Sequence, residues 1–115
     1  MVTPADICAL LGRYRLPVDT EAKLQAEIER LLADNDIAFD REVEIGSGDR
    51  IDFMVDAVGV EVKIKGSKRR ILRQCERYCR SGIDGLVLVT AVATGFPAQI
   101  EGKPVAVHSL GRSWL

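Results

Sequence analysis

The sequence predicts an α/β protein, because helical and strand-like segments alternate along it. Apolar residues recur every three or four positions in residues 20–36 and 67–82, whereas residues 39–65 contain three short strand-like runs separated by turns. The chain has 115 residues, 47% of them hydrophobic, which suits one domain with its own hydrophobic core. We therefore expect residues 1–115 to form a single α/β domain.

Two helices are predicted in the first third of the chain. Thr20 can accept a hydrogen bond from the first turn of a helix over residues 20–36, in which Leu24 and Ile28 lie at helical spacing. The stretch PADICALLG predicts a shorter helix before it, which ends at Gly12.

A later helix and two further strands complete the predicted order. Residues 67–82 carry apolar residues at helical spacing and end at Gly82, a frequent helix terminator. Residues 85–92 form a short apolar run, typical of a central strand covered on both faces, and residues 103–110 predict a last strand. The main elements are therefore expected in the order helix, three strands, helix, strand, strand.

The composition argues against a membrane protein and against a metal or disulfide framework built on cysteine. No apolar run approaches the roughly eighteen residues that a membrane span needs, and the N-terminus does not resemble a secretory signal. We expect a soluble, cytoplasmic protein that does not bind membranes. The cysteines, Cys8, Cys75 and Cys79, are odd in number and lack the paired spacing of zinc ligands.

Residues 49–66 predict a β-hairpin that carries charges at regular intervals. Side chains alternate between the two faces of a strand, so each strand has an apolar row and a row with charges. The apolar rows are Ile51, Phe53 and Val55 on the first strand, and Val60, Val62 and Ile64 on the second. Both rows face one core only if odd-numbered residues pair with even-numbered ones, which puts Asp52 opposite Glu61 or Lys63.

This charged patch has two interpretations. A cross-strand ion pair facing solvent would contribute at most about 1 kcal/mol to stability. Two neighbouring carboxylates repel each other, however, and a divalent cation converts that repulsion into binding. Asp52 and Glu61 are therefore either a structural pair with Lys63 or ligands for a hard cation.

The helix that follows the hairpin is strongly basic, although the net charge of the whole chain is only −1. The cations between residues 63 and 80 are Lys63, Lys65, Lys68, Arg69, Arg70, Arg73, Arg77 and Arg80, and Glu76 is the only acid among them. They form either a solvated helix face or a surface for phosphate groups, since a local cationic patch attracts a polyanion whatever the total charge.

The order of these residues resembles the PD-(D/E)XK nuclease superfamily. Its pattern is an acid on a first helix, an Asp on a strand, and Glu-x-Lys on the adjoining strand, followed by a helix and a strand. The matching positions are Glu27, Asp52, and Glu61 with Lys63, while Ile51 stands where the superfamily has Pro. The resemblance covers residues 20–92 and implies a restriction-endonuclease-like α-β-β-β-α-β core, with a mixed central sheet flanked by helices.

The segment QCERY extends the resemblance to a Gln-x-x-x-Tyr element of nucleases related to the RecB type. Its residues here are Gln74 and Tyr78, which lie one helical turn apart and can face one site. The resemblance implies that both position Lys63, the attacking water or the scissile phosphate. Each has a simpler interpretation, Gln74 as a solvated residue and Tyr78 as a core aromatic.

The resemblance also implies a cofactor and its ligands. Mg²⁺, or Mn²⁺ in its place, would be held by the carboxylates of Asp52 and Glu61 and the backbone carbonyl of Val62. Lys63 would orient the attacking water and offset charge in the transition state. Glu27 would support this ion or hold a second one, or else it is a surface acid paired with Lys23 or Arg30.

The expected function is a Mg²⁺-dependent nuclease that hydrolyses DNA phosphodiester bonds. The residues expected to grip the DNA backbone are Lys65, Lys68, Arg69, Arg70 and Arg73. Two alternatives remain, a catalytically silent nuclease-fold module that binds nucleic acid and an interaction subunit with a structural hairpin. So small a domain is expected to recognise DNA shape or ends, or to act as a homodimer. His108 is expected to be structural, and Trp114 to dock on the body of the domain or on a partner subunit.

Overall fold

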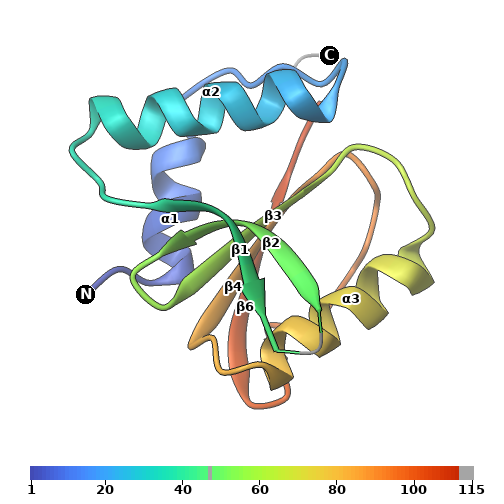
Figure 1. Ribbon diagram of the computed structural model, residues 1–115. Helices are drawn as coiled ribbons and strands as arrows, with labels where there is room; N and C mark the ends of the chain where they lie inside the picture. The colour runs from blue at the N-terminus through green and yellow to red at the C-terminus, as the bar shows by residue number, and fades with distance from the viewer. Residues whose placement is uncertain (47, 112–115) are drawn as a thin grey trace.

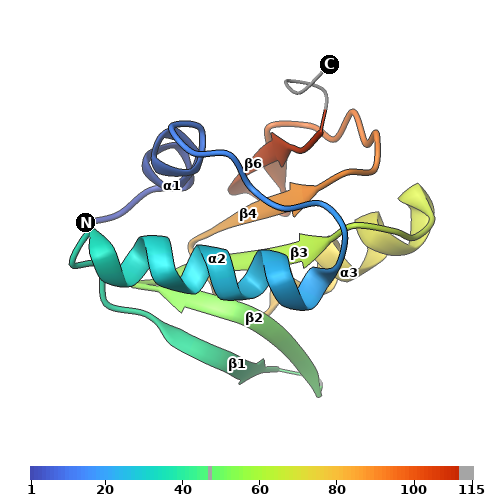
Figure 2. The same ribbon diagram turned by 90° about the horizontal axis from the view of Figure 1, so that it is seen from above.

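The computed structural model describes residues 1–46 and 48–111, which form a mixed sheet with three helices (Figure 1). The sheet has six strands in the order β1-β2-β3-β4-β6-β5. Figure 2 shows β1, β2, β3, β4 and β6 in this order. In chain order the strands are β1 (Asp40–Ile45), β2 (Asp49–Val55), β3 (Val58–Lys63), β4 (Gly85–Thr90), β5 (Gln99–Ile100) and β6 (Lys103–Ser109). Strands β3, β4 and β6 are parallel, and the other neighbours are antiparallel. The α/β prediction is confirmed.

The helices are α1 (Pro4–Leu11), α2 (Glu21–Asp34) and α3 (Lys68–Arg80), and each begins at a side-chain cap. Thr20 caps α2 as predicted, because its hydroxyl accepts the Lys23 N–H at 3.1 Å. Ser67 caps α3 in the same way, and Gly82, just beyond its end, has a positive φ of 93°. These local signals explain why the predicted helix boundaries lie close to the observed ones.

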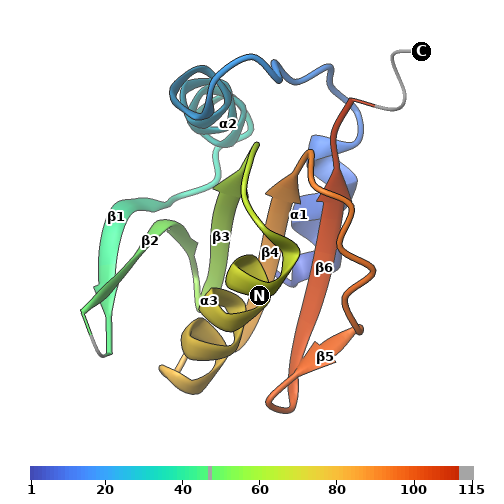
Figure 3. The same cartoon turned by 90° about the vertical axis from the view of Figure 1, so that its right-hand side faces the viewer.

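The helices cover opposite faces of the sheet. Helix α3 lies in front of the sheet and α1 behind it in Figure 3. Leu24 and Ile28 of α2 join Phe53 in the core on the α1 and α2 side, whereas Ile71 and Tyr78 of α3 belong to the core on the other side. Strand β4 is buried along its whole length, which confirms the prediction of a central strand.

The hairpin register confirms one prediction and corrects another. Phe53 pairs with Val60 and Val55 with Val58, so odd numbers pair with even ones as expected. The prediction that Ile51 shares a face with Phe53 is wrong, because Ile51 packs in the core beneath α3. The reason is that the residues of β2 before Phe53 do not pair with β3. The Ile51 side chain lies over Gly59, and a Cβ atom at position 59 would clash with that side chain.

Several smaller features follow the sequence, and one does not. Cys75 and Cys79 are buried, free thiols, as expected from their place in the helical pattern. Strand β5 was not predicted. No helix in residues 1–46 and 48–111 is long and apolar enough to cross a membrane. Trp114 lies outside the described residues.

Candidate active site

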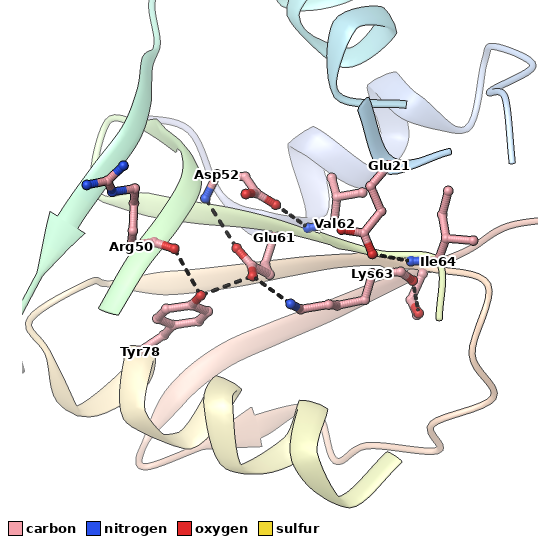
Figure 4. A network of polar contacts seen from close by, with 9 residues as sticks. Glu21, Arg50, Asp52, Glu61, Val62, Lys63, Ile64 and Tyr78 are labelled. Carbon is pink, nitrogen blue, oxygen red and sulfur yellow. Dashed lines mark hydrogen bonds and ion pairs between the residues drawn. The ribbon is translucent and has the colours of Figure 1, made fainter. Parts of the chain in front are cut away.

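Asp52 and Glu61 meet where the β2–β3 ladder ends. The Asp52 N–H donates to Glu61 Oε1 at 3.2 Å, and the Val62 N–H donates to Asp52 Oδ2 at 2.8 Å (Figure 4). Each carboxylate thus accepts a backbone N–H from the opposite strand. Since these backbone groups do not move with side-chain rotamers, the two acids are held in fixed positions.

Glu61 is anchored by α3 as well as by β2. Its side chain is only 4% exposed, and the Tyr78 hydroxyl lies 3.0 Å from its Oε2 atom. The same hydroxyl lies 3.2 Å from the carbonyl oxygen of Arg50. Tyr78 is therefore a core aromatic, as its simpler interpretation holds, and its hydroxyl contacts the Glu61 carboxylate. Its implied role in positioning Lys63, the attacking water or the phosphate stays a prediction.

Lys63 lies on the same face of β3 as Glu61, and Asp52, Glu61 and Lys63 together form one charged cluster. Its Nζ atom lies 3.6 Å from Glu61 Oε2, and its side chain is 27% exposed, so a ligand can reach it from solvent. The Thr90 hydroxyl donates to the Lys63 carbonyl at 2.6 Å and fixes the end of β3 against β4. The register therefore brings Asp52, Glu61 and Lys63 into one patch, as alternation along the hairpin predicts.

The electrostatics of this patch shift both carboxyl groups toward their neutral forms in the absence of a divalent cation. Burial raises the pKa of Glu61 to about 8, and the neighbouring Asp52 charge adds to the shift. Burial also raises the pKa of Asp52, against the opposing effect of the Val62 N–H. Lys63 lowers both pKa values, but less than burial raises them. A divalent cation would reverse this balance by favouring the charged forms.

Helix α2 places Glu21, and not Glu27, against the backbone at the end of β3. Glu27 forms two hydrogen bonds with Arg30, at 2.7 and 2.8 Å, so the alternative of a surface ion pair describes its contacts. The carboxylate near the cluster is that of Glu21, whose Oε2 atom accepts the Ile64 N–H at 3.0 Å (Figure 4). Glu21 lies in the first turn of α2 and contacts the backbone next to Lys63.

Arg41 is a second residue that the sequence pattern does not reveal. Its guanidinium donates to the Asp52 carbonyl at 3.3 Å and to Gln25 at 3.0 Å, and it pairs with Glu29. It also stacks on the Phe53 ring, with Cζ 4.5 Å from the centroid. Arg41 thus ties the hairpin to α2 directly beside Asp52. Neither Glu21 nor Arg41 carries a signal in the sequence, because their roles depend on where α2 crosses the sheet.

The basic face of α3 extends from this cluster. Ile71, Cys75, Tyr78 and Cys79 bury one side of the helix and leave its cations on the other. Arg77 and Arg80 are engaged by Asp49 and Glu101. Within residues 1–46 and 48–111, no ion pair engages the remaining cations of the helix or the preceding turn, namely Lys65, Lys68, Arg69, Arg70 and Arg73. Their charges are open to an anionic ligand.

Gln74 lies between the cluster and these cations. It lines a hollow of about 280 Å³ with Lys63, Lys65 and Arg70, and this hollow opens beside the start of α3. The side chain is half-buried and not fully solvated. Gln74 is therefore near Lys63, on the turn of α3 that precedes Tyr78.

The described residues contain no group of three or more His, Cys, Asp or Glu side chains arranged to hold a metal ion. The acids gathered here are the pair Asp52 and Glu61, with Glu21 on the far side of Ile64. One or two carboxylates are sufficient for Mg²⁺, which keeps several waters and takes further oxygen ligands from a phosphate. His108 is half-buried on β6, where burial lowers its pKa.

This is an α/β protein with a carboxylate pair and a lysine at the end of the β2–β3 ladder, next to the basic helix α3. Comparison of this chain with protein-family models, curated proteins and solved structures finds no match.

Proposed function

We propose that this protein is a Mg²⁺-dependent nuclease that hydrolyses DNA phosphodiester bonds on a restriction-endonuclease-like core. The observation that carries the proposal is the cluster of Asp52, Glu61 and Lys63 at the end of the β2–β3 ladder. This cluster lies beside α3, several of whose cations form no ion pair among the described residues. A structural ion pair would not require two carboxylates held side by side against their repulsion.

The residues present fit a magnesium ion. Asp52 and Glu61 supply a fixed pair of oxygen donors, and the carbonyl of Val62 lies next to Glu61 in β3. Burial is the main cause of the raised pKa values of both acids, with a smaller effect from neighbouring negative charge, and a bound divalent cation would favour their charged forms. Bound Mg²⁺ would polarise the phosphate and favour ionisation of the attacking water, and Mn²⁺ is expected to substitute for it.

The protein's own groups have distinct tasks in hydrolysis. A water oxygen forms a bond to phosphorus while the bond to the leaving oxygen breaks, and one proton passes from the water to the leaving group. The Lys63 ammonium stabilises the added negative charge on the phosphate oxygens. Tyr78 orients Glu61, and Glu21 holds the backbone beside Lys63. Both act as positioning residues.

The basic face of α3 would bind the phosphates on either side of the scissile bond. Arg70 and Gln74 line the same hollow as Lys63, so a strand bound along the helix would pass the cluster. Lys65, Lys68, Arg69 and Arg73 would add contacts that set register and affinity without reading base sequence.

Calorimetric titration with Mg²⁺ and with Mn²⁺ tests the metal site. Wild-type protein should bind either ion, and Asp52→Asn should lose that binding while keeping its fold, because the amide preserves shape but not charge. An interaction subunit with a structural hairpin would show no binding linked to Asp52. A silent nucleic-acid-binding module would bind DNA through α3 but would not cut it when Mg²⁺ is present.

A further inference from the structure

A second cavity opens on the same face of the sheet as Glu61 and Lys63. It has a volume of about 400 Å³ and lies between the carboxyl ends of β4 and β6 and the segment of residues 91–96. In α/β sheets, ligands bind preferentially outside the carboxyl ends of parallel strands. None of the roles proposed above uses this cavity.

The strand register places the cavity beside the candidate active site. Lys63 pairs with Thr90 of β4, and Thr90 pairs with Ser109 of β6, so the three residues form one row across the parallel strands. Adjacent strands lie about 4.8 Å apart, which puts Ser109 roughly 10 Å from Lys63. Thr90 and Ser109 both line the cavity. A bound group would therefore lie roughly 10 Å from a phosphate at Lys63.

The walls of the cavity suit a neutral group with both apolar and polar surface. Phe96, Val107 and Leu110 provide apolar surface, while Thr94 and Ser109 add hydroxyl groups. No ionisable side chain lines it, within the described residues. The volume lies within the range of roughly 300–1,000 Å³ that is usual for small-ligand sites.

Cations flank this uncharged cavity. Lys63 lies one strand away from it, and Lys68 reaches its rim, because the Lys68 Nζ atom is 4.0 Å from where a Cβ atom on Gly95 would lie. Gly95 itself lines the cavity. An occupant that satisfies both features is neutral but is carried on an anionic chain, and Phe96 in the lining offers an aromatic ring for stacking. A nucleobase on a DNA strand has this chemistry.

We propose that this cavity receives an unpaired nucleobase next to the phosphate bound at Lys63, an inference that rests on the proposed nuclease function. A base within a duplex is paired and stacked, and it reaches a pocket only after it leaves the helix. The substrate class of the site is therefore single-stranded DNA or a frayed end. Stacking on Phe96 would tolerate any base, since every base has a π-face.

The test compares binding and cleavage by the whole chain on matched DNA. The probes are a single-stranded oligonucleotide, its blunt duplex, and a series of single strands that each carry one abasic position. Affinities are measured by fluorescence anisotropy with EDTA present, and cleavage is measured separately with Mg²⁺. The variants are Ala93→Trp, which adds a bulky side chain at the exposed part of the lining, Phe96→Ala, which removes the aromatic ring from the lining, and Ala98→Trp as control. Ala98 is exposed in the same loop and does not line the cavity.

The single strand should bind more tightly than the duplex, and one abasic position should weaken its binding roughly 5- to 100-fold, the usual effect of losing one stacked base. Ala93→Trp and Phe96→Ala should weaken intact single strands to a similar extent and abolish the abasic effect, whereas Ala98→Trp should bind like wild type.

Equal affinity for single strand and duplex would overturn the inference. So would Ala93→Trp and Phe96→Ala variants that bind single strands like Ala98→Trp. Both outcomes count even if Mg²⁺-dependent cleavage is observed. Base-dependent binding without cleavage of any DNA would instead overturn the proposed nuclease function and leave the base site in place.

Discussion

Asp52 and Glu61 are charged residues that the hairpin accommodates because each accepts a backbone N–H from the other strand. The Glu61 side chain is 4% exposed, so its carboxyl group is almost completely shielded from solvent. Burial favours the neutral form of this group by more than the nearby Lys63 and the Tyr78 hydroxyl favour the charged form. When no metal is bound, ionised Glu61 therefore lowers the stability of the fold. This is an unusual property for a residue whose role is only structural.

This property predicts how stability depends on pH in the absence of divalent ions. Unfolded Glu61 ionises near its ordinary pKa of 4.5, whereas folded Glu61 keeps its proton up to about pH 8. The folded state therefore binds more protons between these values, and the free energy of unfolding should fall as pH rises through this window. Asp52, whose pKa is also raised, acts in the same direction.

Glu61→Gln should flatten this decline, because the amide cannot ionise in either state. The measurement is urea denaturation at several pH values with EDTA present. Glu44→Gln on the exposed side of β1 is the matched control and should keep the wild-type slope. Parallel profiles for wild type and Glu61→Gln would contradict the assignment of a proton to buried Glu61.

Lys63→Ala is expected to separate catalysis from binding. Removal of the ammonium should reduce turnover by about a hundredfold or more, because it acts on charge that develops in the transition state. Metal and DNA should still bind, since Asp52, Glu61 and the cations of α3 remain. Single-turnover cleavage is the measurement, with Lys23→Ala, an exposed lysine paired with Asp19, as control. Normal turnover in Lys63→Ala would leave Lys63 as a strand-face ion pair.

The two acids of α2 provide a matched comparison. Glu21→Gln should reduce turnover roughly tenfold, because a neutral amide accepts the Ile64 N–H more weakly and leaves Lys63 less well positioned. Glu27→Gln should have little effect, because its partner is Arg30 on an exposed part of α2. The ratio of turnover in the two variants is the readout. A larger loss of turnover in Glu27→Gln than in Glu21→Gln would instead support Glu27 as the acid that α2 supplies to the site.

The sequence predicts the local part of this site and not the part that depends on packing. Period-two alternation brings Asp52, Glu61 and Lys63 together without knowledge of any other element. Glu21 and Arg41 enter the site only because α2 crosses the sheet in one particular position. No spacing within the sequence encodes that position, since it follows from how side chains of distant segments fill a shared core.

At the scale of elements, α3 divides into a buried face and a basic face. Its buried residues hold the helix on the sheet, so the cations can be changed without loss of the core. Replacing Arg69, Arg70 and Arg73 with Ala, singly and together, should weaken DNA binding similarly for all sequences. The slope of log affinity against log salt should also become shallower by about one for each phosphate that the variant no longer neutralises.

Arg80→Ala is the control on the same helix, because Glu101 engages Arg80. Anisotropy titrations from low to moderate salt give the slopes. Slopes that stay unchanged in the triple variant would show that this face of α3 serves only solvation.

The elements also show where sequence patterns lose their predictive value. Predicted helix and strand positions hold for segments with strong caps or strong periodicity, such as α2 and β4. Strand β5 has only two residues and follows Pro97, so it carries no detectable alternation. Ile51 departs from simple alternation because β2 leaves β3 at this point, a tertiary effect that period-two reasoning does not contain.

At the scale of the whole molecule, the candidate functional residues lie on one face of the sheet, near the carboxyl ends of its parallel strands. Lys63, Thr90 and Ser109 end three parallel strands, and α3 lies in front of the sheet in Figure 3. The carboxylate pair, the basic helix face and the neutral cavity thus lie within reach of one bound strand. The opposite face, covered by α1 and α2, holds the larger apolar core.

Cleavage of DNA by purified protein tests the central claim most directly. Wild type, Asp52→Asn and the exposed control Asp84→Asn are incubated with linear, circular, single-stranded and branched DNA, with Mg²⁺ or with EDTA. Wild type and Asp84→Asn should cut at least one substrate only when Mg²⁺ is present, and folded Asp52→Asn should cut none. Folded wild-type protein that cuts no DNA with Mg²⁺, or Asp52→Asn that cuts as fast as wild type, would contradict the account.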